Sequence, residues 1–187
     1  MLDEVHGIDV MVVDEAVDIG VHDRRPTVGT GDVIVTDRSD VHLAVWAADC
    51  APLVLVADDG RVVGAHAGWR GLADGVIDAA VDAARGSGGA VIAAVLGPSI
   101  GQCCYEFGRD DLAAVAEGVH ASESDVAGVS ASGERALDVP GAVRAGLDHH
   151  GIALDVVGPC TGCDDRWFSH RVRSDLGRHA TVAVIGS

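Results

Sequence analysis

The sequence contains neither lysine nor asparagine, and all 13 of its basic residues are arginine. The missing lysine excludes Schiff-base catalysis and phosphate binding by a Walker A loop, because each depends on a lysine amine. Long apolar runs are also missing, since none approaches the length of about 18 residues that a membrane-spanning helix needs. We therefore expect neither of those two chemistries and no membrane span.

Positive charge is scarce, because 13 basic residues stand against 29 acidic ones and the formal net charge is −16. This balance disfavours nucleic acid and acidic membrane surfaces as partners. It does not exclude small anionic substrates, because one arginine at a binding site can outweigh the electrostatic field of distant acidic residues. The length of 187 residues suits a single domain with a substantial core, and we expect a monomer or a weak homodimer.

The cysteine count is five, and an odd number agrees better with free thiols or metal ligands than with a disulfide framework. Together with the lack of an apolar leader, this count favours a reducing compartment, and we expect a cytoplasmic protein.

The sequence around Asp59-Gly60 organises the chain. Apolar runs over residues 53–57 and 61–65 flank this pair, and Asp-Gly between alternating apolar residues predicts a tight β-hairpin. With Asp58 opposite Arg61, Leu53 lies opposite His66. Because Pro52 cannot donate to a strand ladder, we expect a bend between Cys50 and Leu53 that brings the Cys50 sulfur toward His66.

The sequence AGWRG follows His66 and leads into an amphipathic pattern that predicts a helix over residues 72–84. A strand, a glycine-rich turn and a helix start resemble an anion site, in which free N–H groups meet the Arg70 guanidinium. The hairpin therefore offers a thiol, an imidazole and a clamp for phosphate or carboxylate.

The remaining pattern predicts a layered α/β (α+β) domain with a mixed β-sheet flanked by helices. We expect about seven strands and two or three helices, and a surface loop over residues 121–133. The other predicted strands lie in the segment HGIDVMVVD, which His6 begins, and over residues 32–36, 42–48, 90–96, 152–157 and 180–185. The other predicted helices cover residues 112–119 and 139–149.

His6, Cys50 and His66 form a candidate metal site, because three protein ligands and one open position are what catalytic zinc uses. The alternative is that Cys50 and His66 are buried structural residues, since free cysteine is among the most buried types. The polar neighbours Asp49 and Arg70 favour the functional interpretation, because such groups at the end of a hairpin fill a core poorly. Asp49 is a candidate general base or orienting group.

Two other groups of residues have simpler interpretations. Cys160 and Cys163 have the spacing of a metal or redox pair, but Cys103 and Cys104 are adjacent and lack the spacing of a second pair. We expect a packing or incidental redox role for them. His170 and Arg171 begin a run of positive charge that either lines a substrate-anion pocket or forms salt bridges, with salt bridges as the default.

The segments ADCAPLVLV, AHAGWRGLADGV, LGPSIGQCCYEFG and CDDRWFSHRVRSDLGRHA together resemble the laccase-domain proteins, also called the YfiH-like family. EVHGIDV is similar to that family's Q-V-H-G-x-x-V segment, with Glu4 in place of glutamine. The resemblance covers residues 4–184. It implies a YfiH-like single domain over residues 1–187 without the family's N-terminal region. It also implies a three-ligand metal site that falls on His6, Cys50 and His66.

As function, the resemblance implies a zinc-dependent purine nucleoside phosphorylase acting on adenosine, inosine and S-methyl-5'-thioadenosine, with adenosine deaminase activity as an addition. Zinc would activate water or orient a substrate oxygen. Nucleoside and phosphate would be the small-molecule partners. Phosphate would bind Arg70 and the backbone N–H groups from Gly68 to Gly71, with His170 or Arg171 lining the other wall.

Three alternatives stay open. The first is an editing amidase on peptidoglycan precursors, with Cys50 as nucleophile and His66 as base. The second is copper-dependent oxidation of phenols as a side activity. A full multicopper site is excluded, because nine histidines without one H-x-H pair cannot hold four coppers. The third is a metal-binding or partner-binding domain without catalysis.

Overall fold

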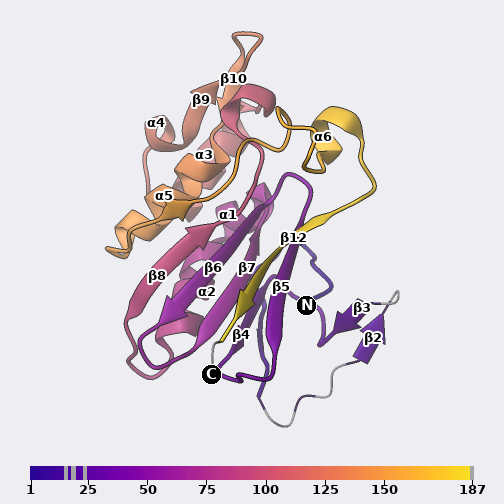
Figure 1. The fold of residues 1–187 in the computed structure, drawn as a ribbon. Coiled ribbons are helices and arrows are strands. Elements are labelled where there is room, and N and C mark those ends of the chain that lie inside the picture. Colours follow the sequence, from indigo (N-terminus) through magenta and orange to yellow (C-terminus); the bar gives the residue numbers. More distant parts are fainter. Residues whose placement is uncertain (15–16, 18–19, 23–24, 186–187) are drawn as a thin grey trace.

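The computed structural model describes residues 1–14, 17, 20–22 and 25–185 (Figure 1). Its centre is a mixed sheet of six strands in the order β1-β4-β7-β6-β8-β11. The outer pairs β1/β4 and β8/β11 are parallel, and the inner pairs are antiparallel. The strands of this sheet are β1 (Val10–Val12), β4 (Val33–Thr36), β6 (Ala51–Ala57), β7 (Val62–Ala67), β8 (Val91–Leu96) and β11 (Asp155–Val156).

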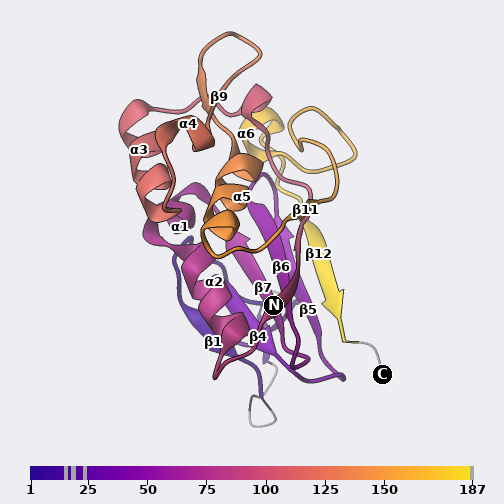
Figure 2. The same ribbon diagram turned by 90° about the vertical axis from the view of Figure 1, so that its left-hand side faces the viewer.

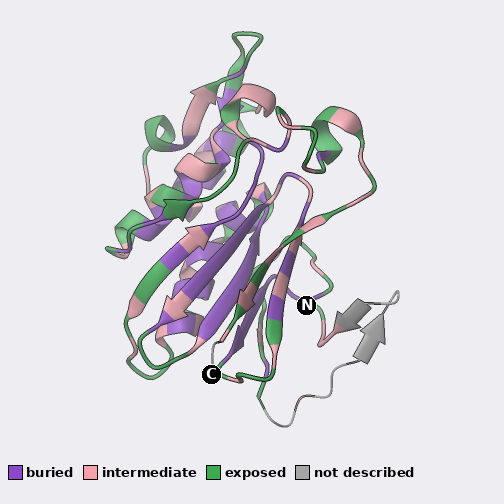
Figure 3. Cartoon of the chain, viewed as in Figure 1, coloured by how far each residue is buried: buried purple, intermediate pink, exposed green. Residues whose placement is uncertain are grey.

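Helices cover one face of the sheet, and a two-stranded ribbon of β5 (His42–Ala47) and β12 (His179–Val184) covers the other (Figure 2). The main core lies between helices and sheet, and a smaller apolar cluster lies under the ribbon. Figure 3 shows the central strands buried, whereas β12 alternates between half-buried and exposed residues. The helices are α1 (Trp69–Asp74), α2 (Val76–Arg85), α3 (Arg109–Gly118), α4 (Glu123–Val126), α5 (Val139–His149) and α6 (His170–Arg173).

Two short antiparallel hairpins and one 3₁₀ turn complete the chain. The hairpins pair β2 (Gly20–His22) with β3 (Arg25–Thr27) and β9 (Ala127–Val129) with β10 (Arg135–Leu137), and the 3₁₀ turn covers Gln102–Cys104. The mixed sheet flanked by helices confirms the predicted fold class. The expected number of strands was too low, since the described residues form twelve strands. None of the helices in these residues has the length and apolar character that a bilayer crossing requires.

The predicted β6–β7 hairpin is present, but its register differs from the prediction by one residue. Leu53 pairs with Ala65, and Pro52 pairs with His66. The reason is a three-residue loop: the Ala57 N–H donates to the Arg61 carbonyl at 2.9 Å, and Gly60 has φ +91°. A left-handed residue at the third loop position is typical of such hairpins. The expected bend after Cys50 is also wrong, because β6 is regular from Ala51 and the chain turns at Asp49, with φ +98°.

Gly75 divides the helix expected over residues 72–84 into α1 and α2. Its φ of +93° places it in the left-handed region, and its N–H caps α1 by donating to the carbonyls of Gly71 and Leu72. The prediction of a surface loop over residues 121–133 is also wrong. A capping box between Ser122 and Asp125 starts α4, and β9 follows directly. In contrast, α5 has the predicted bounds, with a proline in its first turn.

We predict that Leu55→Ala lowers the free energy of unfolding by about 2–5 kcal/mol, because Leu55 on β6 is fully buried in the main core. Denaturant titration followed by circular dichroism measures the loss. The matched control is Leu176→Ala, since Leu176 is 92% exposed and should change stability by less than about 0.5 kcal/mol. Equal losses in the two variants would contradict this assignment of the core.

Candidate metal centre and its pocket

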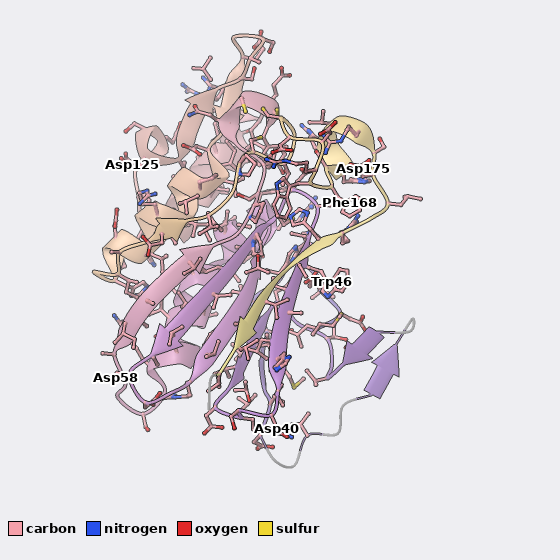
Figure 4. The ribbon with its side chains drawn as sticks, viewed as in Figure 1. Asp40, Trp46, Asp58, Asp125, Phe168 and Asp175 are labelled. Atoms are coloured by element: carbon pink, nitrogen blue, oxygen red, sulfur yellow. The ribbon has the colours of Figure 1, made fainter. Side chains whose placement is uncertain are left out.

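A pocket of about 460 Å³ lies at the open end of the β6–β7 hairpin. Five stretches of the chain line it: the segment before β1, the turn between β5 and β6, the end of β7 with the start of α1, the loop after β8, and the segment around α6. Figure 4 places two residues of these surroundings, with Trp46 on β5 and Asp175 beside α6. The pocket is thus built where the first residues of the chain and the segment around α6 meet the hairpin.

The structure brings the three predicted metal ligands together in this pocket. One nitrogen or sulfur atom from each of His6, Cys50 and His66 lies within 4.8 Å of the others. The His6 Nε2 atom is 3.8 Å from the Cys50 Sγ atom, and the two imidazole rings meet edge to face at 4.9 Å between centroids. His66 is buried and His6 is exposed, so the group faces the solvent from one side.

Asp32, which precedes β4, fixes both histidines. Its carboxylate accepts a hydrogen bond from His66 Nδ1 at 2.8 Å and others from the backbone N–H groups of His6, at 2.9 Å, and Gly7, at 2.7 Å. Because an ionised carboxylate only accepts, His66 carries a proton on Nδ1, and Nε2 is the ring nitrogen on which a metal ion would replace a proton. A carboxylate behind a ligating histidine is the usual orienting partner in metal sites.

The charges within the pocket favour a reactive Cys50. Burial opposes ionisation of its thiol, but hydrogen bonds from His6 and His66 outweigh that effect and lower the pKa of Cys50 to about 7. Burial also disfavours charge on His66, yet the hydrogen bonds to Asp32 and Cys50 raise the pKa of His66 to about 10. The thiolate is the form of cysteine that ligates metals and acts as a nucleophile.

Asp49 lines the same pocket, but both of its carboxylate oxygens already accept hydrogen bonds. The donors are the Thr161 hydroxyl and the Arg171 backbone N–H, each at 2.7 Å. The Asp49 carbonyl also accepts from the Ile100 N–H at 2.9 Å. Asp49 therefore connects three distant segments behind the pocket.

Arginine and aromatic side chains form the rest of the pocket wall. Arg70 lies over the Trp69 ring at 4.4 Å, and Arg171 lies over the Tyr105 ring at 5.2 Å. His170 and Arg178 also line the pocket, so the positive charge near α6 contributes to this wall. Burial raises the pKa of Tyr105 to about 12, which keeps its hydroxyl neutral.

Gly68 and Gly71 are not among the residues that line the pocket. An added Cβ on Gly68 would lie 2.7 Å from the His6 ring and 3.3 Å from the Cys50 sulfur, so glycine permits the close approach of these two ligands. Gly71 packs inside α1, where an added Cβ would lie 3.1 Å from the Gly7 carbonyl oxygen. Gly68 thus lies directly against two of the candidate ligands, and Gly71 allows α1 to pack against the segment that follows His6.

Several pocket residues were not predicted from the sequence. Glu4 and Tyr105 line the pocket, and the fold alone brings them there. Asp32 was also not predicted; it lies behind the two histidines, and its only local signal is a carboxylate directly before an apolar strand. Burial raises the pKa of Glu4, which accepts a hydrogen bond from the Trp46 backbone N–H.

The expectation for the other cysteines was wrong in one respect. Cys103 and Cys104 do join Cys160 and Cys163, and one sulfur from each lies within 4.8 Å of the others. Cys103 and Cys104 reach the other two sulfurs without C-x-x-C spacing, because the 3₁₀ turn after β8 lies against the turn at residues 160–163.

Fold and site together define a mixed α/β domain with a candidate metal centre of two histidines and one cysteine. The chain belongs to the family described as multi-copper polyphenol oxidoreductase laccase, whose family model matches residues 1–186. This match confirms the family resemblance that the sequence motifs indicated.

Individual relatives agree with this assignment. The chain is 38% identical over 193 residues to a purine nucleoside phosphorylase of Xylella fastidiosa, covering 99% of this chain and 71% of the relative. It is 31% identical to the solved structure of YlmD from Geobacillus stearothermophilus, with a TM-score of 0.79 and coverage of 97% and 71%. For the hypothetical protein YfiH of Bacillus licheniformis the identity is 29%, the TM-score 0.81 and the coverage 97% and 72%.

We predict that Asp32→Asn weakens zinc binding at the His6, Cys50 and His66 site by about 10- to 100-fold, because the amide no longer fixes the His66 tautomer. Competition with a chromophoric chelator measures the affinity. Asp40→Asn is the matched control, since the Asp40 side chain is 70% exposed and lies at the opposite end of the molecule from Asp175 (Figure 4). Equal zinc affinity in both variants would contradict the orienting role of Asp32.

Proposed function

We propose that the protein is a zinc-dependent purine nucleoside phosphorylase acting on adenosine, inosine and S-methyl-5'-thioadenosine, with adenosine deamination as a second activity. The observation that carries the proposal is the presence, in one pocket, of a two-histidine, one-cysteine centre and a wall of arginine side chains. Relatives at 34–38% identity carry the name purine nucleoside phosphorylase, which supports the same substrate class.

The residues present fit a zinc ion. The donor set is of the kind that catalytic zinc uses, and the hydrogen bond from His66 Nδ1 to Asp32 leaves Nε2 as the ring nitrogen on which a metal ion would replace a proton. His6, Cys50 and His66 would hold the ion, which would supply Lewis-acid polarisation of an oxygen atom in the pocket. Copper suits the same donors and is the second candidate.

The side chains of the pocket divide the binding of the two substrates. Arg70, Arg171 and Arg178 supply fixed positive charge for phosphate, and guanidinium groups bind phosphate oxygens in bidentate fashion. Trp46, Trp69 and Tyr105 give apolar wall area for a purine ring. In phosphorolysis a phosphate oxygen bonds to the sugar carbon as the carbon–nitrogen bond to the base breaks, so the pocket must hold both substrates side by side.

In this proposal Asp49 positions other residues of the pocket and does not itself transfer a proton. Both of its carboxylate oxygens are occupied by Thr161 and Arg171, so it holds the α6 segment against the turn that carries Cys50. His170 stands beside Arg171 at the pocket wall and is exposed to an entering anion.

Hydrolysis of an amide by Cys50 is the second candidate function. The observation that favours it is the lowered pKa of the Cys50 thiol, which hydrogen bonds from His6 and His66 cause, because a thiolate beside a protonated imidazole is an activated nucleophile. Zinc held stoichiometrically by that thiolate would oppose this mechanism. Oxidation of phenols with copper in the same site would be a side activity.

As partners we propose nucleoside and phosphate alone, without nucleic acid or a membrane surface, for a monomer or weak homodimer. The net charge of −16 supports the first part. The five cysteines are free thiols, which supports a cytoplasmic location.

We predict that Cys50→Ala abolishes phosphate-dependent release of base from adenosine and inosine and also removes the zinc bound at this site. Both losses follow from the loss of one thiolate ligand of three. A coupled assay for free base and elemental analysis of the purified protein measure them together. Phosphorolysis that persists in this variant would remove the metal centre from the mechanism.

We predict that Arg70→Ala raises the KM for phosphate by about 10- to 100-fold, because a charge-assisted hydrogen bond contributes about 1.5–3 kcal/mol. Arg166→Ala is the matched control, since the Arg166 side chain is 77% exposed, pairs with Asp164 and lies outside the pocket. Initial rates at varied phosphate measure both variants. An unchanged KM for Arg70→Ala would exclude Arg70 from phosphate binding.

A further inference from the structure

A second group of potential metal ligands lies outside the pocket, in four cysteines from two loops. Cys103 and Cys104 come from the 3₁₀ turn after β8, and Cys160 and Cys163 come from the turn that follows β11. One sulfur from each lies within 4.8 Å of the other three. The Cys163 sulfur is 3.2 Å from that of Cys103 and 3.4 Å from that of Cys104.

The backbone around these sulfurs is built for close approach. An added Cβ on Gly162 would lie 2.8 Å from the Cys104 Cβ and 2.9 Å from its sulfur, so only glycine fits there without a shift. An added Cβ on Gly101 would lie 3.3 Å from the Cys160 Cβ. Cys163 and Asp164 both donate their N–H groups to the Cys160 carbonyl at 3.1 Å, which closes the turn that presents the two sulfurs on one side.

We propose that Cys103, Cys104, Cys160 and Cys163 bind one zinc ion in a tetrahedral site of four thiolates, separate from the centre at His6, Cys50 and His66. Four sulfurs at the usual zinc–sulfur distance of about 2.3 Å lie roughly 3.8 Å apart at the corners of a tetrahedron. The sulfur–sulfur distances here, from 3.2 Å to at most 4.8 Å, span that value. On binding, four S–H bonds break, four zinc–sulfur bonds form and four protons pass to solvent.

Two contacts favour the negative charge of such a centre. The Gly101 N–H donates to the Cys160 sulfur at 3.1 Å, a contact that stabilises a thiolate. Arg173 donates to the carbonyls of Thr161 at 3.0 Å and Gly162 at 3.2 Å, which places a cation beside the turn. The Arg173 guanidinium is also held by a hydrogen bond to the Asp175 carboxylate.

A disulfide explains this arrangement less well. The Cys163 sulfur is almost equally close to Cys103 and Cys104, so no single pair is selected. A single disulfide would also use only two of four sulfurs that lie together, although Gly101 and Gly162 make room for Cys103, Cys104 and Cys160. Four ligands without an open position are typical of structural zinc, whereas the three-ligand pocket centre suits catalysis.

The proposed ion would join two walls of the active-site pocket. Tyr105 follows Cys104 directly, and Thr161 follows Cys160 and donates to Asp49. The loop of residues 97–108 has one short 3₁₀ turn, and the residues from Val157 to Ser169 form no helix or strand. A zinc ion shared by these segments would hold them together where their own secondary structure does not.

The decisive experiment is zinc analysis and zinc-edge X-ray absorption on full-length Cys50→Ala protein purified under reducing conditions. This variant lacks a ligand of the pocket centre but keeps all four thiols of the second site. We expect about one zinc per chain, surrounded by four sulfurs at about 2.3 Å. The result does not depend on enzymatic activity, so the proposed function can fail while this proposal stands.

The reciprocal variant is Cys163→Ser, at the most exposed of the four positions. We expect Cys163→Ser to lose the four-sulfur signal and the double variant with Cys50→Ala to hold no zinc after dialysis against a chelator. Zinc-free Cys50→Ala protein, or a mass spectrum in which two of these cysteines have lost their hydrogens to a disulfide, would overturn the proposal. Should Cys163→Ser fail to fold, the absorption spectrum of Cys50→Ala protein decides alone.

Discussion

The candidate site depends on one buried carboxylate. Asp32 is 1% exposed, yet it accepts hydrogen bonds from the His66 ring and from the backbone N–H groups of Val5, His6 and Gly7. Burial alone would raise its pKa, but these donors outweigh that effect and lower the pKa of Asp32, so the group stays ionised. The same four bonds hold the start of the chain against the end of β7. A single charge therefore sets the tautomer of one histidine and the backbone position of the other.

Asp49 performs a related task for the opposite wall. Its carboxylate joins residues that are 112 and 122 positions away in the sequence, and its backbone carbonyl joins the loop after β8. Asp49 has a positive φ, a backbone conformation that is unfavourable for any residue other than glycine, so this position is strained. The network of bonds around Asp49 keeps it there. The metal ligands are thus fixed from the N-terminal side and the arginine wall from the C-terminal side.

These long-range hydrogen bonds could not be predicted from the sequence, whereas elements with local signals could. The Asp-Gly turn, the apolar strand at β8 and the helix α5 have local signals, and all three are present close to their predicted bounds. The predicted register of the hairpin was wrong by one residue, because Asp-Gly fits both two- and three-residue loops. Only the backbone conformation at Gly60 distinguishes the two. The partnership of Asp32 with His66 and the meeting of the four cysteines had no local signal, since each requires tertiary packing between distant segments.

The composition explains why the pocket needs such fixing. With 3% aromatic residues and 25 glycines, the chain has few large side chains with which to hold loops by packing. Strands β6 and β7 at the centre of the sheet are buried on both faces, but most of the pocket wall comes from loops and turns at their ends. Hydrogen bonds from Asp32 and Asp49 fix two of these loops. The loop that carries Tyr105 contacts the turn at residues 160–163 through one backbone hydrogen bond, from Thr161 to Ser99, and through cysteine sulfurs and glycines. A metal ion at that point would supply the rigidity that small side chains cannot.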